Sequence, residues 1–302
     1  MSRTFQEQAS LFLQEAVSRA RKPLKPASVH GFESYLRKWV NPQLGVLPLS
    51  EVNNKTVKVL VAKMLQAQLS AKSIDNVVGL IKLVVSSDLD ENGEPRHIRK
   101  WNSAFLDMPV VRNQHRPKLT PDVVEKLAKC PKLGMLYTLL ASTGLRIGEA
   151  LGLETRHVQG RTLVIQQSCW YGVIQTPKTF NAFRNIDLAP AVADMLQKFI
   201  GGRRFGLVFG NGAGNPHSQT NLLRRSLHPL LQEAGCDKMG FHALRRFRVT
   251  WLRKQRCSED LLRYWLGHAS RTVTDDYVML KEDLDFRLEV AEKVGVGFSL
   301  PA

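Results

Sequence analysis

The stretch that decides the fold of this chain covers residues 240–277 and reads GFHALRRFRVTWLRKQRCSEDLLRYWLGHASRTVTDDY. Its apolar positions recur at helical spacing, which predicts one helix over residues 242–254 and a second over 258–266. Gly267 stops the second helix, and the pair Thr272 and Asp275 resembles a capping box that opens a third. This run of helices favours a mainly helical domain.

Four polar side chains of this stretch are candidates for chemistry, although each by itself is an ordinary feature of a helix or turn. His242 and Arg245 stand three residues apart and project from one face of a helix, while His268 lies in the turn after Gly267. Tyr277 falls one turn into the third helix. The spacing HxxR lacks the second histidine and the acid of the zinc motif HExxH, so it does not indicate a metal site.

A second informative segment lies upstream, at residues 141–153, and reads ASTGLRIGEALGL. One helix ends at Thr143 and Gly144, and another is predicted over residues 147–151. Arg146 opens this second helix and Glu149 follows one turn later. The two residues share a face and can form an ion pair.

The rest of the second half combines helices with one small antiparallel sheet. Residues 162–167, 173–176 and 184–188 are rich in Val, Ile and Thr and are predicted as strands. The last two strands are predicted to form a hairpin over residues 175–188, with Lys178 just before its turn and Asn181 in the turn. Further helices are predicted over residues 122–128, 133–142, 191–199, 222–234 and 283 onward.

The first half is predicted to be helical throughout. Amphipathic helices are indicated over residues 5–21, 28–40, 53–69 and 73–85, separated by prolines that include Pro42. Residues 107–122 hold three prolines and little periodicity, which is typical of a linker, and Thr120 is placed to cap the next helix. We therefore expect a helical domain over residues 1–108, a linker over 109–119 and a second domain over 120–302.

The charge of the chain favours a polyanionic partner. Of its 302 residues, 43 are Lys or Arg and 27 are Asp or Glu, a net charge of +16. Residues 1–118 and residues 119–302 each carry a net +8, so both halves can contact nucleic acid, as a clamp would. The sequence has no long apolar run and no signal-peptide pattern, and its four cysteines are scattered, which predicts a cytoplasmic protein with reduced thiols.

Taken together, these motifs resemble the tyrosine recombinase family, the phage integrase class. The order TGLRxxE, hairpin lysine, HxxR, LGH and a tyrosine nine residues later covers the whole second half. The resemblance implies the short two-domain form: an all-helical core-binding domain followed by an α+β catalytic domain. The fold class is then mainly α with a small antiparallel β-sheet, and the two domains form a C-shaped clamp on DNA.

The resemblance also implies the roles of three residues that move atoms. Tyr277 would be the nucleophile that attacks a scissile DNA phosphate, forming a 3′-phosphotyrosyl link and releasing a 5′-hydroxyl. His242 would act as general base, since a free tyrosine has a pKa near 10. Lys178 would protonate the leaving 5′-oxygen.

Four further residues would stabilise the reacting phosphate. Arg146 and Arg245 would bind its non-bridging oxygens, and His268 would add a hydrogen bond. Glu149 matches an acidic position of the family and would orient its neighbours. Two Arg, one Lys and two His meet the charge demand, so no metal, ATP or other cofactor is expected.

The resemblance predicts partners as well. These are double-stranded DNA recombination sites, three further subunits in a homotetrameric synaptic complex that passes through a Holliday junction, and DNA-bending accessory proteins, with no membrane. A mobile genetic element is the expected context. The C-terminal helix would dock on a neighbouring subunit. Additional DNA contacts are predicted for Lys72, Arg246, Arg248 and Arg271.

Several alternatives stay open at this point. The chain could be a DNA-binding relative that does not cleave, or an enzyme of the type IB topoisomerase kind. Lys198 and Arg184 compete with Lys178 for the leaving-group role. Tyr171 lacks an LGH segment before it, and Tyr264 precedes His268 and is expected to pack, so Tyr277 is the preferred nucleophile.

Overall fold

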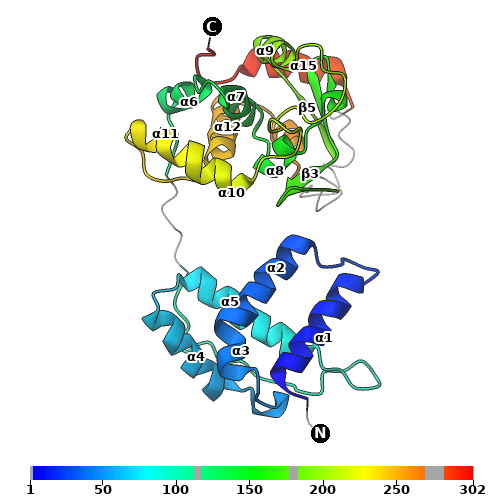
Figure 1. Ribbon diagram of the computed structural model, residues 1–302, viewed down its shortest axis with the longest axis vertical. Helices are drawn as coiled ribbons and strands as arrows, with labels where there is room; N and C mark the ends of the chain where they lie inside the picture. The colour runs from blue at the N-terminus through cyan, green and yellow to red at the C-terminus, as the bar shows by residue number, and fades with distance from the viewer. Residues whose placement is uncertain (1–2, 112–116, 177–182, 269–281, 302) are drawn as a thin grey trace. The chain divides into compact units, whose positions relative to one another are not determined.

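The computed structural model of the chain describes residues 3–111, 117–176, 183–268 and 282–301. By its internal contacts the chain divides into two compact units, Met1–Gln114 (unit 1) and His115–Ala302 (unit 2), drawn in Figure 1. Of the helices in the described ranges, none is both long and apolar enough to cross a lipid bilayer. The linker expected at residues 109–119 includes residues 112–116, which lie outside the described ranges.

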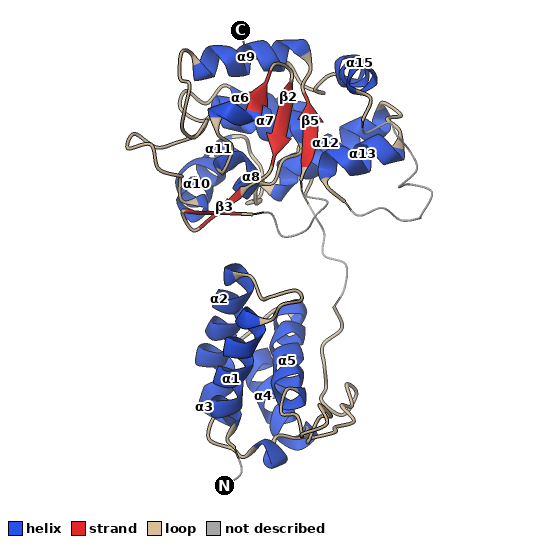
Figure 2. Cartoon of the chain, turned by 90° about the vertical axis from the view of Figure 1, so that its right-hand side faces the viewer, coloured by secondary structure: helices blue, strands red, loops and turns tan. Residues whose placement is uncertain are grey.

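Unit 1 is helical in its described part (Figure 2). Its α-helices are α1 Phe5–Ser18, α2 Pro26–Tyr35, α3 Asn41–Leu44, α4 Asn54–Gln66 and α5 Ala71–Ser86. Thr4 and Asn53 cap α1 and α4 through capping boxes, and the hydroxyl of Ser70 caps α5. The apolar face of α5 is buried in a core that it shares with α1 and α4. The four predicted helical regions are therefore confirmed, with ends shifted by a few residues.

Each unit contains a helical run that passes through a proline. In unit 1, α2 continues through a π-helical turn, Leu36–Val40, into α3, which contains Pro42. Proline lacks an N–H, and its ring clashes with the carbonyl four residues earlier, so a wider turn just before it relieves the clash. The prediction that Pro42 separates two helices was wrong for this reason. In unit 2 the same device, a π-helical turn over Leu223–Leu227, precedes Pro229.

Unit 2 is mainly helical with short antiparallel strands, so the predicted fold class is confirmed. Its helices include α6 Pro121–Ala128, α7 Gly134–Thr143, α8 Ile147–Leu151, α9 Pro190–Ile200, α10 Gln219–Leu222, α11 His228–Glu233, α12 His242–Lys254, α13 Glu259–Leu266 and α15 Leu284–Val294. Helix α7 lies against α6, α9 and α12, and all its residues from 136 to 143 are buried (Figure 1). This central helix ends at the segment that carries Arg146.

The strands pair differently from the predicted hairpin. The strands are β1 Val158–Gln159, β2 Thr162–Ile165, β3 Ser168–Trp170, β4 Val173–Gln175 and β5 Arg184–Asp187. They form a three-stranded sheet in the order β1-β2-β5 and a separate pair β3-β4. Tyr171 and Gly172, both with positive φ, make the two-residue turn between β3 and β4. The predicted pairing of residues 173–176 with 184–188 was therefore wrong, because β4 pairs back onto β3 and β5 pairs with β2.

The C-terminal segment packs on its own unit. The Arg287 guanidinium of α15 bonds to the buried carboxylate of Asp187 at 2.8 Å, and the Trp251 indole N–H donates to the Val294 carbonyl at 2.7 Å. Phe298 is buried against the ring of Phe247. Docking of this segment on a neighbouring subunit, which the family resemblance implied, would require these contacts to open.

Candidate active site

Arg146 and Glu149 form the ion pair that their spacing predicted. Gly144, with φ of 73°, ends α7, and Arg146 stands directly before α8. The Glu149 carboxylate accepts the backbone N–H of Arg146 at 2.9 Å and its guanidinium at 2.8 Å. Because the Arg146 side chain remains 39% exposed, its guanidinium is oriented by Glu149 and still faces solvent.

Glu149 has a second partner that the sequence did not reveal. Arg184 of β5 donates two bonds to the Glu149 carboxylate, at 3.1 and 2.9 Å, and both side chains are almost fully buried. Burial alone would raise the pKa of Glu149, but the bonds and charges of Arg184 and Arg146 outweigh it and hold that pKa below 4.5. The carboxylate is thus ionised at neutral pH. The two residues stand 35 positions apart, so no local pattern could pair them.

Arg245 links the segment that carries Arg146 to the end of α13. It projects from the first turn of α12 and donates to the backbone carbonyls of Gly144 at 2.7 Å and Leu266 at 2.5 Å. Burial and the nearby charge of Arg146 lower the pKa of Arg245 to about 10, so it remains a cation at neutral pH. These contacts join the end of α7, the start of α12 and the end of α13.

His268 lies beside Arg245. Its Nε2 is 3.1 Å from Nη2 of Arg245, and since a guanidinium can only donate, Nε2 is the acceptor. The proton of the neutral ring then sits on Nδ1, which is the nitrogen left to donate. Burial, together with the charges of Arg245 and Arg146, holds the pKa of His268 below 6.5.

His242 occupies the first position of α12, on the same side as Arg245. Part of its surface is exposed to solvent. The burial of the rest of the residue, together with the charges of Arg245 and Arg146, holds the pKa of His242 below 6.5. The fields of the same two arginines therefore act on both His242 and His268. Five of the sequence-predicted residues, from three separate segments, are brought together here: Arg146, Glu149, His242, Arg245 and His268.

Three predicted residues lie outside the described ranges. These are Tyr277, Lys178 and Arg271. Tyr264 packs as expected: its hydroxyl accepts the backbone N–H of Asn185 at 3.2 Å.

The residues predicted to contact DNA differ in exposure. Lys72 is exposed and pairs with Asp75 at 2.6 Å, and Arg246 is half-buried with one bond to the Pro117 carbonyl at 3.1 Å. Arg248 is only 4% exposed and donates to the carbonyl of Gly295. Its predicted contact with DNA is corrected: its guanidinium is turned into unit 2 and tethers the C-terminal segment.

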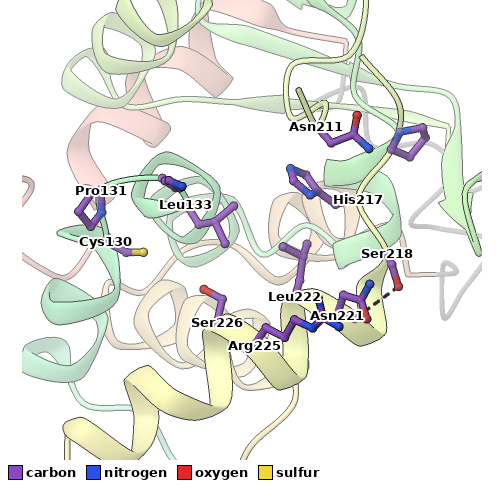
Figure 3. A pocket seen from close by; sticks show the side chains of 12 residues that line it. Cys130, Pro131, Leu133, Asn211, His217, Ser218, Asn221, Leu222, Arg225 and Ser226 are labelled. Carbon is purple, nitrogen blue, oxygen red and sulfur yellow. Dashed lines mark hydrogen bonds between the residues drawn. The ribbon is translucent and has the colours of Figure 1, made fainter. Parts of the chain in front are cut away.

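A separate cavity opens between the α6–α7 turn, the loop before α10 and the π-helical turn Leu223–Leu227 (Figure 3). It encloses about 720 Å³, with Leu133 and Leu222 among its apolar lining and Lys132, His217 and Arg225 among its polar lining. No carboxylate is among its lining residues. No sequence pattern indicates this cavity, because its walls come from two segments far apart in the chain, residues 130–133 and 211–226.

Within the described ranges, no group of three or more His, Cys, Asp or Glu side chains could hold a metal ion. The four cysteines, all in described positions, are free thiols. Burial raises the pKa of the Cys257 thiol to about 11, so it is protonated at neutral pH.

Comparison with known proteins defines the class. The model of the phage integrase family matches residues 117–283, more than half of the chain, so the chain belongs to that family. A tyrosine recombinase described as XerC-like, from Caldanaerobacter subterraneus subsp. tengcongensis, is 22% identical over 84% of this chain and 74% of its own length. The family resemblance stated from the motifs is thereby confirmed.

Solved structures show the same fold. The integrase of transposon Tn1549, in complex with transposon right end DNA, matches 94% of this chain and 99% of its own with a TM-score of 0.69 and 19% identity. A lambda integrase tetramer bound to a Holliday junction matches 90% of this chain and 79% of its own, with a TM-score of 0.65 and 16% identity.

Proposed function

We propose that the chain is a site-specific DNA recombinase that cleaves and rejoins DNA strands through a covalent bond to Tyr277. One observation carries the proposal: Arg146, Arg245, His242 and His268 converge in a protein of the phage integrase family. Two cations beside two neutral imidazoles suit a phosphodiester, whose negative charge grows in the transition state.

In the proposed cleavage step, the Tyr277 oxygen attacks the phosphorus atom while the bond to the 5′-oxygen breaks. His242 takes the phenol proton, and Lys178 supplies a proton to the leaving 5′-oxygen. Arg146 and Arg245 bind the non-bridging oxygens, and His268 donates from Nδ1. The 3′-phosphotyrosyl ester retains the phosphodiester energy, so attack by a 5′-hydroxyl of the partner strand rejoins the DNA without ATP.

The neutral state of His242 supports its role as base. A base must be unprotonated at the working pH, and partial burial together with the neighbouring cations lowers the pKa of His242 and so favours the neutral imidazole. The ion pair of Arg146 with buried Glu149 supports its role as a phosphate ligand, because one face of the guanidinium is held while the other stays open.

The complexes of the relatives suggest how the chain assembles. We propose a homotetramer on two recombination sites that passes through a Holliday junction, with the helical unit 1 as the core-binding part of a clamp and DNA-bending proteins as accessories. We also propose that the protein acts in the cytoplasm, where its DNA substrate would lie. A mobile genetic element is the proposed context, as for the similar integrase of transposon Tn1549.

The first test uses nicked DNA carrying the candidate attachment site, in excess EDTA, followed by a denaturing gel. Wild type should form a covalent protein–DNA adduct, and Tyr277→Phe should bind the same DNA without forming one. An adduct with Tyr277→Phe would show that another residue is the nucleophile. Tight binding without an adduct from wild type would favour the DNA-binding relative that does not cleave.

A second assay separates the topoisomerase alternative. A recombinase should leave a supercoiled plasmid without recombination sites unrelaxed, and it should join two sites placed on one plasmid. Relaxation of the plasmid that lacks sites would favour the topoisomerase reading.

A further inference from the structure

The side chain of Arg184 is the most deeply buried cation that touches the candidate active site. Its exposed fraction is 0%, against 39% for Arg146. A residue so enclosed cannot reach a DNA strand, which removes it as a rival of Lys178 for protonating the leaving oxygen. Its contacts nevertheless link the segments that carry the phosphate ligands.

The first link runs through Glu149. Two guanidinium nitrogens of Arg184 bond to the two carboxylate oxygens, at 3.1 and 2.9 Å. The same carboxylate holds the backbone and the guanidinium of Arg146. The orientation of Arg146 therefore depends on a carboxylate whose own position is fixed by Arg184.

The second link runs through the end of α13. Nε of Arg184 donates to the carbonyl of Trp265 at 2.7 Å. The next carbonyl, that of Leu266, accepts from Arg245, which also bonds to His268. One side chain thus braces the carboxylate behind Arg146 and the backbone turn that holds Arg245 and His268.

Energetic reasoning favours a geometric role. Burying an ion pair seldom adds stability over an apolar pair of the same volume, because both ions lose their hydration. A forked guanidinium that makes these three bonds to described residues, in contrast, fixes direction as well as distance. A mutation that misplaces reacting groups by about 1 Å can slow an enzymatic reaction about 100-fold.

We propose that Arg184 is a positioning residue of the recombination reaction, which aligns Arg146 through Glu149 and aligns Arg245 and His268 through the end of α13. This inference rests on the proposed function, since it assumes that the two arginines bind the scissile phosphate.

The test compares Arg184→Met with wild type in single-turnover cleavage of the nicked DNA at saturating protein. Two substrates are used, one with the natural phosphate and one with a methylphosphonate, which is neutral, at the scissile position. If Arg184 aligns cations for a charged oxygen, the variant should be about 100-fold slower on phosphate and less than about 10-fold slower on methylphosphonate. DNA affinity should change less than about threefold, because Arg184 does not contact DNA.

Controls separate positioning from folding. Arg248→Met also removes a buried guanidinium bonded to backbone, and it should keep the wild-type ratio of the two rates. If Arg184→Met does not fold, Arg184→Lys retains the charge without the fork and should show the same substrate-dependent defect in weaker form. The combined defect of Arg184→Met and Glu149→Gln should be smaller than the product of the two single defects, because both substitutions disrupt the same Arg184–Glu149 contact.

The outcomes are distinct. Equal slowing on both substrates would mean that Arg184 only supports folding, and a wild-type rate would mean that it has no role; either result overturns the inference while the recombinase function stands. Failure of wild type itself to form an adduct on phosphate would instead overturn the proposed function.

Discussion

At the scale of single residues, Glu149 contributes both to the stability of unit 2, through buried Arg184, and to the candidate active site, through Arg146. It is 3% exposed and is shared by two arginines, one buried and one facing solvent. Its neutralisation would leave Arg184 buried with a neutral partner. The consequences can be measured without DNA.

Glu149→Gln should destabilise unit 2 by about 3 kcal/mol, because removing one ion of a buried pair leaves the other charge buried without a counter-ion. Glu292→Gln is the matched control: its carboxylate also pairs with an arginine but is 62% exposed, so we expect a loss below about 1 kcal/mol. Denaturant unfolding of the two variants provides the measurement. Equal losses in both would contradict the buried-pair interpretation.

The same residue contributes a pH dependence of known sign. The pKa of Glu149 is lowered in the folded chain, so its contribution is present above the ordinary value of 4.5 and is lost as the pH falls through the folded-state pKa. The stability difference between wild type and Glu149→Gln should therefore shrink on acidification below pH 4.5.

His242 sets the pH dependence of cleavage. Because its pKa lies below 6.5, the base is neutral at pH 7 and is lost only on acidification below that value. Cleavage under subsaturating conditions should be level from pH 8 to 7 and then fall by about tenfold per pH unit well below the pKa. His242→Asn should remove this acid limb. A limb centred above pH 7 that this variant abolishes would refute the assignment.

At the scale of elements, the contact between α8 and β3 shows why the segment after Arg146 is rich in glycine. A Cβ on Gly148 would lie 2.6 Å from Oγ of Ser168 and 2.8 Å from the carbonyl oxygen of Cys169. A Cβ on Gly152, one turn later, would lie 3.1 Å from the backbone nitrogen of Cys169 in β3. The short helix that begins beside Arg146 is thus pressed directly onto a strand.

Gly148→Ala should destabilise unit 2 and slow cleavage, since β3 or α8 must shift. Gly79→Ala is the control: it also lies within a helix, α5, but has open space around it. That variant should stabilise unit 1 by about 0.5–1 kcal/mol. Thermal unfolding of both variants decides, and stabilisation by Gly148→Ala would contradict the close contact.

The same elements show what sequence patterns can and cannot predict. Apolar spacing and capping residues are local, so α12 and α13 were predicted to within a residue. Strand partners are not local: β2 skips β3 and β4 to pair with β5, which the alternation in each strand cannot reveal. The motif residues of the site were predictable, whereas Arg184 and the inward direction of Arg248 depended on contacts across 35 and 47 positions.

At the scale of the whole molecule, the net charge of +16 predicts strongly salt-dependent DNA binding. The logarithm of the binding constant should fall linearly with that of the salt concentration, with a slope of about −0.9 per phosphate neutralised. If Lys72 contacts a phosphate, Lys72→Gln should reduce the slope by about 1. Arg248→Gln, a buried site, should leave the slope unchanged. A flat salt response in wild type would contradict binding by both halves of the chain.

The bond between Ser299 and Glu125 has a consequence for engineering. The backbone N–H of Ser299 donates to the carboxylate of Glu125 at 2.8 Å, so the last residues of unit 2 lie against α6, its first helix (Figure 1). Neighbouring ends are the condition for circular permutation. In unit 2 taken without unit 1, a short peptide could join residue 301 to residue 117. New ends could then open at the exposed loop of residues 211–215 without breaking the site around Glu149.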